Sequence, residues 1–530
     1  MSDWSMGYRT DVLYTYGYYR ELNPLFVKFM LTSQGYACPD FGPGACACEL
    51  GFGQGVSINM HAMGSEVNWF GTDFNPSQVN FARTIAELGS CPVTLKDDDF
   101  ASFAQRPDLP DFDLIALHGI WSWISPENQD VIIDFVRRKL KVGGVLYISY
   151  NVSPGFMLME PVRHLMREFD QEMVAAKANA DERVATISNF INALLGTNPD
   201  TIKAVPILRE RIAGALGAPT SGDGKVGAGA RDTHYLIGEY LNTYWDISHF
   251  STLAERFDAA KVSFACSASP KDLLDSINLS AADQQLLAPL KGKNIYETTR
   301  DFIVNRQFRR DYFIKGPMTL SPAQQEHAVD QLCFILMDPP SEVKYTMESR
   351  LGEAHLMESI YRPIVELMGD FKVRSFAEIL AELNKDQITI ARQNLLEAIL
   401  TLSCNGTLSP AVKLDTVNPE VVARCRKFNH TLLEQEHIAQ MKFLASPVLQ
   451  GAFSLSDVFK VLLQIKLQEP NITRDALCQK LYDIALSNGK TLNKDGKPIT
   501  KRKEQEVILS EQVDLFLKHS LPLMEAMGTL

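Results

Sequence analysis

The chain has 530 residues and a formal net charge of −12, from 52 basic and 64 acidic residues. Its length predicts roughly two to four domains. Its 45% hydrophobic and 22% charged residues are typical of a globular chain and exclude disordered and coiled-coil classes. The acidic balance argues against nucleic acid as a partner and leaves room for a basic, lysine-bearing protein.

The sequence predicts neither a membrane span, nor a signal peptide, nor a metal site. No apolar run approaches the roughly 18 residues of a membrane span, and the N-terminus lacks the apolar segment of a signal peptide, so we expect a cytoplasmic protein without membrane insertion. The nine cysteines are scattered, with no CxxC pair and no His/Cys cluster at zinc spacing. We therefore predict no metal site.

Strands and helices alternate in the first 150 residues. We expect strands at 45–50, 67–73, 92–95, 112–118 and 145–150, with helices after the first, second and fourth. This alternation predicts parallel pairing, and hence a Rossmann-like α/β fold with a mostly parallel, doubly wound sheet. A helix at 251–260 and a strand at 261–266 return the chain to this sheet, so we place the sheet domain at 1–275.

The rest of the chain is mainly helical in period. We predict a helical insertion at 158–232 that ends in a Gly-rich mobile loop at 221–230 and forms a homodimer contact. A middle, regulatory domain follows at 276–412. Its helices at 376–383 and 387–403 precede a turn and a small strand, a winged-helix-like arrangement, although no basic cluster suggests DNA binding. Residues 413–530 form a helical C-terminal domain.

The clearest motif is Glu-Leu-Gly-Phe-Gly-Gln-Gly at 49–55, between the first strand and its helix. Glycines here allow a sharp turn and a close approach of the backbone to a ligand. A dinucleotide fingerprint would place a small residue at position 56, which is Val56, and a P-loop would continue with Lys-Ser or Lys-Thr. The acid at Glu49 disfavours a pyrophosphate and suits a ligand with a cationic amino group, such as S-adenosyl-L-methionine.

Two further acids stand where that ligand needs them. Asp73 closes the second strand, where a carboxylate accepts both ribose hydroxyls, and Asp98 follows the third, where it would accept the adenine amino proton. A helix N-cap or a solvated turn is the alternative for Asp98 or Asp99 alone. The residues predicted to bind the cofactor are Glu49, Gly51, Phe52, Gly53, Gln54, Gly55, Asp73, Phe74, Asp98, Asp99 and His118.

Three further segments carry a family resemblance. They are LHGIWSWI at 117–124, YISYNVSPGF at 147–156 and YTYGYYRELNP at 14–24. Together with the Gly loop they resemble bacterial class I methyltransferases with a methyltransferase regulatory domain, and in particular rickettsial protein lysine methyltransferases. The resemblance implies dependence on S-adenosylmethionine, a dimer formed through the insertion and a winged-helix-like region. The aromatic segment at 14–24 departs from the rickettsial pattern, which leaves the substrate open.

The loop after the fourth strand is expected to face the reactive methyl, since ligands in this fold lie beyond the carboxyl ends of the strands. Trp121 and Trp123 would then line a channel for a lysine ammonium, with packing alone as the alternative. His118 is a candidate proton acceptor or hydrogen-bonding group. The residues predicted to be catalytic are His118, Trp121, Trp123, Tyr150 and Asn151, and those predicted to bind substrate are Tyr14, Tyr16, Tyr18 and Trp121.

The favoured function is methyl transfer to lysine side chains of a protein substrate. A small-molecule methyltransferase is a second hypothesis, which the two accessory regions disfavour because a small substrate needs no large docking surface. A cofactor-sensing interaction protein without turnover is a third. Consumption of the cofactor in the presence of substrate separates the third hypothesis from the other two.

Overall fold

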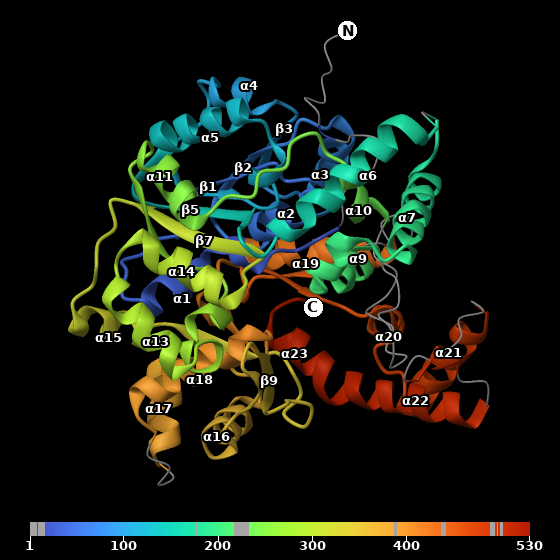
Figure 1. The fold of residues 1–530 in the computed structure, drawn as a ribbon. Helices are drawn as coiled ribbons and strands as arrows, with labels where there is room; N and C mark the ends of the chain where they lie inside the picture. Colours follow the sequence, from blue (N-terminus) through green and yellow to red (C-terminus); the bar gives the residue numbers. More distant parts are fainter. Residues whose placement is uncertain are drawn as a thin grey trace.

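A seven-stranded sheet forms the centre of the part of the chain that the structure describes (Figure 1). The computed structural model describes residue 8 and residues 16–175, 177–216, 233–385, 390–435, 441–487, 493–494, 497–498 and 502–530. The strands follow the order β3-β2-β1-β4-β5-β7-β6. They are β1 (Cys46–Leu50), β2 (Asn68–Thr72), β3 (Val93–Lys96), β4 (Phe112–Leu117), β5 (Leu140–Asn151), β6 (Val262–Ser267) and β7 (Phe308–Lys315).

The sheet is parallel from β3 to β5, and β7 is antiparallel to both β5 and β6. Alternate residues of each strand enter different cores, as the pleat requires. Cys48 and Ile115 pack toward one face, and Ala47 and Leu114 toward the other. Helices α4 (Phe100–Ala104), α5 (Pro126–Lys139) and α11 (Phe250–Asp258) cover the first face. Helices α1 (Pro24–Ser33), α2 (Val56–Gly64) and α3 (Pro76–Gly89) cover the second.

The mostly parallel α/β fold predicted from the sequence is confirmed, but the sheet extends beyond the predicted end of its domain at 275. Strand β7 lies between β5 and β6 and pairs with β5 from Phe308 to Ile314. The sequence did not predict this strand because its central residues include Arg309 and Asp311, which are charged. Both are buried, and they pair with each other at 2.7 Å.

The predicted insertion is helical and has a small core of its own. Its helices are α6 (Glu160–Met173), α7 (Ala180–Gly196), α8 (Asp200–Ala204), α9 (Ile207–Leu216) and α10 (Thr233–Tyr240). Buried Met166, Ile187, Ile212 and Ile237 join these helices. In Figure 1 they stand to one side of the sheet. The predicted mobile loop at 221–230 lies outside the described residues, and the dimer contact stays a prediction. Helices α12 (Asp275–Asn278), α13 (Ala281–Leu287) and α14 (Asn294–Val304) connect β6 to β7.

The middle part differs from the expected helix–helix–hairpin order. After α17 (Phe376–Lys385) and α18 (Arg392–Cys404), strand β12 (Leu408–Ala411) pairs with β8 (Cys333–Leu336), far back in the chain, in a sheet completed by β11 (Arg374–Ser375). The next element is not a returning strand, so the winged-helix-like assignment stays a prediction. The other elements are α15 (Pro322–Asp330), β9 (Thr346–Ser349), β10 (Gly352–His355) and α16 (Glu358–Met368).

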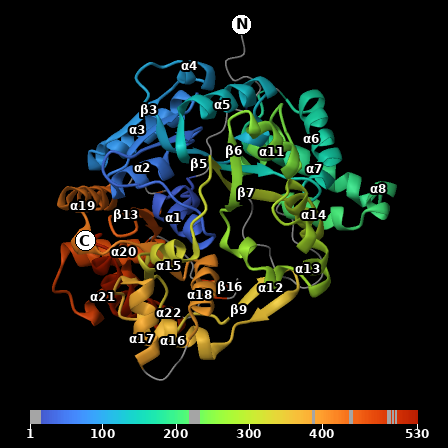
Figure 2. The same cartoon turned by 90° about the vertical axis from the view of Figure 1, so that its left-hand side faces the viewer.

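The C-terminal part packs directly on the first helices of the sheet domain. Helix α19 (Pro419–Glu434) and strand β13 (Phe443–Ser446) lie beside α2 and α3, as Figure 2 shows. Phe428 of α19 shares a core with Met60 and Met63 of α2. The remaining elements are β14 (Gly451–Ser454), α20 (Asp457–Gln468), α21 (Arg474–Ser487), β15 (Asn493–Lys494), β16 (Lys497–Pro498), α22 (Arg502–Leu515), a π-helical turn (Phe516–Ser520) and α23 (Leu521–Ala526). No helix of the described residues has the length and apolarity to cross a membrane.

Candidate active site

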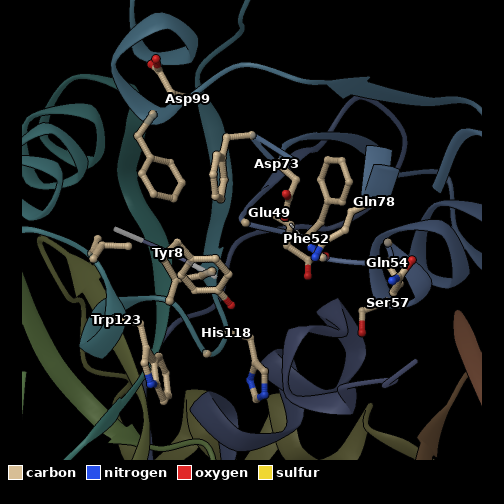
Figure 3. Close-up of a pocket in the computed structure, with 18 of the residues that line it drawn as sticks. Tyr8, Glu49, Phe52, Gln54, Ser57, Asp73, Gln78, Asp99, His118 and Trp123 are labelled. Atoms are coloured by element: carbon tan, nitrogen blue, oxygen red, sulfur yellow. Dashed lines mark hydrogen bonds between the residues drawn. The ribbon is translucent and has the colours of Figure 1, made fainter. Parts of the chain in front are cut away.

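A pocket opens at the carboxyl ends of β1 to β4. All eleven residues that the sequence predicts to bind a cofactor line it. In Figure 3 Asp99 lies at one end, Trp123 and His118 lie at the other, and Glu49 and Asp73 lie between them. The pocket therefore has an acidic middle and an aromatic end. The role of these residues as cofactor ligands stays a prediction.

The Gly loop turns the chain sharply from β1 into α2. Gly51, Gly53 and Gly55 all have positive φ, at 72°, 57° and 69°, a region that side chains disfavour. A Cβ on Gly51 would lie 2.3 Å from Cδ1 of Ile120, and one on Gly55 would lie 2.4 Å from Cβ of Ala82. Two of the glycines are thus required by the packing of neighbouring loops and helices, and Gly53 leaves backbone exposed to the pocket.

Glu49 places a buried carboxylate at the end of β1. Its side chain is 3% exposed, and Oε2 has no hydrogen-bond partner among the described residues. Burial, with the nearby Asp73 carboxylate, raises the pKa of Glu49 to about 8. An unpaired buried carboxylate is costly. A cation bound beside it would remove that cost.

Asp73 lies immediately after β2 and is tied to the Gly loop. Its Oδ2 accepts the backbone N–H of Gly53 at 2.8 Å, and its Oδ1 accepts that of Asn75 at 3.0 Å. Turned with its amide nitrogen inward, Gln78 donates to both oxygens at 3.2 Å. Burial raises the pKa of Asp73 to about 7, against the opposing effect of the two backbone hydrogen bonds. The carboxylate is therefore held rigidly at the middle of the pocket.

The two acids after β3 have different roles. Asp99 caps α4, because its Oδ1 accepts the N–H of Ser102 at 2.7 Å. The N-cap alternative for this residue is thus confirmed, although it also lines the pocket. Asp98 pairs with Arg106 at 3.1 Å, and Phe100 lines the pocket beside it. An aromatic ring and acidic side chains together form the end of the pocket that suits a flat heterocycle.

His118 is held in a stack at the opposite end. Its Nδ1 lies 2.7 Å from the hydroxyl of Tyr147, and its ring stacks on Tyr19 with a centroid distance of 3.6 Å. Burial, with a contribution from Arg310, lowers the pKa of His118 to about 3. The imidazole is therefore neutral near pH 7 and is a poor acceptor for a proton from an amine.

The structure separates the two tryptophans that the sequence treated alike. Trp123 lines the pocket, and its indole N–H donates to the carbonyl of Glu239 at 3.4 Å. Trp121 is 1% exposed, does not line the pocket, and packs on Phe257 under the guanidinium of Arg256. The predicted channel can contain only Trp123. Trp121 is a packing residue of the core, which was the alternative to a role in the channel.

The other predicted catalytic residues lie away from the pocket. Tyr150 is fully buried and donates to Asp311 of β7 at 2.8 Å. Asn151 donates its N–H to Ser122 at 2.8 Å and its amide to Glu239 at 3.2 Å. Neither residue lines the pocket. Both connect the carboxyl end of β5 to neighbouring elements.

The predicted substrate-binding tyrosines are also not brought to the pocket. Tyr16 packs on Phe81 and Tyr18 on His61, both on the side of α2 and α3. Tyr14 lies outside the described residues. Gly17 and Tyr19 line the pocket instead. Residues 16–19 have no regular secondary structure, so no periodicity in the sequence indicates which of their side chains face inward.

Several lining residues were not predicted. They are Tyr8, Gly17, Val56, Ser57, Gln78, Gly119, Ile120, Ile124, Ser125 and Asn128. Ser57 and Gln78 lie on the first turns of α2 and α3, the ends of those helices that face the carboxyl edge of the sheet. These two residues could have been predicted from the sequence, because each lies in the first turn of a helix that follows a parallel strand, and such turns face the ligand site. Tyr8 also lines the pocket, where its ring meets that of Phe74 edge to face with a centroid distance of 5.9 Å.

The two buried acids predict a pH-dependent stability. Because folding raises the pKa of Glu49 and Asp73, the folded protein holds protons that the unfolded chain releases above about pH 4. The contribution of these two groups to the free energy of unfolding of the ligand-free protein should therefore be complete below that pH. That free energy should fall by about 2 kcal/mol or more between pH 5 and pH 8. Urea unfolding at both pH values measures this. Glu49→Gln should flatten the dependence and the exposed Glu87→Gln should not; equal slopes in all three proteins would contradict the assignment.

Comparison with known proteins agrees with this geometry. Residues 232–315 match the family described as a predicted methyltransferase regulatory domain. The chain is 32% identical over 534 residues, 99% of both chains, to the uncharacterized protein sll1526 of Synechocystis. It is also 27% identical over 146 residues to the uncharacterized protein RP028 of Rickettsia prowazekii, which is 27% of this chain and 57% of that one.

The structure resembles PKMT2 from Rickettsia typhi in complex with AdoHcy, with a TM-score of 0.68, 16% identity, and coverage of 97% of this chain and 99% of that chain. The two proteins therefore share one fold over nearly their whole length. The chain belongs to the family of sll1526, and its residues 232–315 match the predicted methyltransferase regulatory domain. The matched domain includes β6 and β7 of the central sheet, not only the region after 275.

Proposed function

We propose that the protein is an S-adenosylmethionine-dependent methyltransferase that acts on lysine side chains of a protein substrate. The observation that carries the proposal is the buried carboxyl group of Glu49, whose Oε2 has no partner among the described residues, in a pocket that Gly53 and Asp73 also line. A ligand that combines a cationic amino acid part with a ribose satisfies both carboxylates at once.

The pocket suits each part of this cofactor. Glu49 would accept hydrogen bonds from the amino group, and Asp73 would accept the ribose hydroxyls. The end with Asp98, Asp99 and Phe100 would hold the adenine. The methionine part then extends toward Trp123 and His118, the aromatic end of the pocket in Figure 3.

The aromatic end suits a lysine side chain. Trp123, Tyr19 and Ile120 offer apolar and aromatic surface to the alkyl chain and its ammonium. When bound, the cofactor supplies an electrophilic methyl on a sulfonium, which a neutral amine attacks in line. Because the pKa of His118 is lowered to about 3, we infer that the amine loses its proton through desolvation rather than to this imidazole. His118 then acts by positioning Tyr19.

A protein substrate is favoured over a small one by the architecture. The chain places a helical insertion, a middle part and a C-terminal part around one pocket, and its net charge of −12 suits a basic partner. The resemblance to PKMT2 of Rickettsia typhi supports this choice. We also propose that the protein is a homodimer formed through the insertion and that it acts in the cytoplasm.

Labelled cofactor tests the proposal. The protein is incubated with S-adenosylmethionine carrying a tritiated methyl and an extract of the cells that encode it, and proteins are separated from small molecules. We expect label in protein that hydrolyses to methyl-lysine, and none with the Gly53→Arg variant. Label in the small-molecule fraction alone would contradict the lysine assignment, and cofactor binding without any transfer would contradict turnover.

A further inference from the structure

A second cavity lies on the far side of the N-terminal segment from the active site. Its volume is about 510 Å³, which is within the range of small-molecule sites. Its wall combines three regions: the segment around Tyr18 and Arg20, the loops next to β8 and β12, and the C-terminal part from β13 to α23. The predicted cofactor residues do not line it.

The C-terminal wall of this cavity contains an irregular turn with an unpaired polar atom. Residues Phe516–Ser520 form a π-helical turn, a feature that occurs frequently at functional sites. His519 on this turn is 8% exposed and lines the cavity. Its Nε2 is enclosed by protein atoms and has no partner among the described residues, so the ring forms part of the wall of the cavity and does not offer it an exposed acceptor.

The charges around the cavity select the chemistry of a ligand. The charged residues that line it are Arg20, Asp338 and Glu342. Arg20 is directed to the carbonyl of Cys404 at 3.0 Å and lies over the ring of Phe26. Asp338 accepts one hydrogen bond from Thr407 at 2.7 Å through Oδ2. The two carboxylates are acceptors, and the guanidinium of Arg20 already donates to a backbone carbonyl, so the wall favours a ligand that donates from a cationic group.

The remaining wall is mainly apolar. Phe443, Leu449, Phe453 and Leu523 line the cavity between the polar groups. We propose that this cavity is a binding site for a small amine with an apolar body, its ammonium directed to the carboxylate of Asp338.

The proposed amine site and the candidate active site share the N-terminal segment as a common wall. Tyr18 and Arg20 line the second cavity, whereas Gly17 and Tyr19 line the first, so this one segment separates the two sites. Tyr19 stacks on His118 at 3.6 Å. A ligand that shifts Tyr18 or Arg20 also moves Tyr19, so the amine is expected to change the affinity of the first pocket for its own ligand, and the reverse by the same factor.

Calorimetry with phenethylamine tests the site, with phenylacetate as a probe of opposite charge. The full chain is saturated with S-adenosylhomocysteine, so that the carboxylates of the first pocket are occupied. We expect phenethylamine to bind with a Kd of about 1 mM or tighter, and phenylacetate about tenfold more weakly or not at all. Asp338→Asn keeps an oxygen for Thr407 and should weaken amine binding about tenfold.

Two further variants keep the test decisive. Ser454→Lys places an ammonium at the exposed rim of the cavity and should also weaken amine binding, whereas the exposed Asp415→Asn, outside the cavity, should leave it unchanged. Absence of saturable binding, equal binding of phenylacetate, or equal affinity in Asp338→Asn would each overturn the proposal. Binding that leaves the affinity for S-adenosylhomocysteine unchanged would overturn the connection through Tyr19. None of these readouts depends on methyl transfer.

Discussion

Gly53→Arg is expected to abolish cofactor binding while the protein stays folded. Gly53 has a φ of 57° and presents its backbone to the pocket beside Asp73, so an arginine side chain would occupy the space that the methionine part needs. Titration with S-adenosylhomocysteine should show an affinity at least about a hundredfold weaker than that of the unchanged protein.

A matched control separates this effect from backbone strain. Gly143 also has a positive φ, 80°, and a Cβ there would meet no atom within 4 Å. Gly143→Arg therefore introduces the same side chain and a similar strain of about 1 kcal/mol outside the pocket. It should lower the melting temperature as Gly53→Arg does but retain ligand affinity. Unchanged affinity in Gly53→Arg would rule out this pocket as the cofactor site.

Trp123→Ala is expected to slow methyl transfer about a hundredfold without a comparable loss of cofactor affinity. Trp123 lines the aromatic end of the pocket, whereas Glu49, Asp73 and Asp99 belong to the elements that would hold the cofactor. Misalignment of the acceptor by about 1 Å costs on the order of a hundredfold in rate. Trp123→Phe should recover much of the rate, since an aromatic face remains. Single-turnover rates and S-adenosylhomocysteine titrations measure the two quantities separately.

Trp121 supplies the comparison for that experiment. It is 1% exposed and packs on Phe257, outside the pocket, so Trp121→Ala should reduce the free energy of unfolding by about 3–5 kcal/mol. Well below its melting temperature, this variant should still turn over at a near-normal rate. If Trp121→Ala is stable but inactive, or Trp123→Ala is destabilised yet fully active, the division between packing and channel residues is wrong.

The sequence by itself determined the fold class and the group of acidic and glycine residues in the pocket. Glu49 lies at the end of β1, the Gly loop follows β1, and Asp73 and Asp98 follow β2 and β3, whose carboxyl ends meet at one edge of the sheet because the strands are parallel. Their proximity therefore follows from the local strand pattern and from the parallel pairing of the strands. The place of His118 in the pocket follows in the same way, because His118 comes directly after β4.

Only the tertiary structure decided which side chains face the pocket and which support it. Trp121 and Trp123 share one short turn, and Tyr18 and Tyr19 are neighbours, so their orientation depends on contacts with α11, α10 and α2 that lie far away in the chain. Strand β7 was not predicted because Arg309 and Asp311 become compatible with burial only when they pair with each other and with Asp301 and Glu297 of α14. Such pairs form between segments that folding brings together, and no local pattern of hydrophobicity records them.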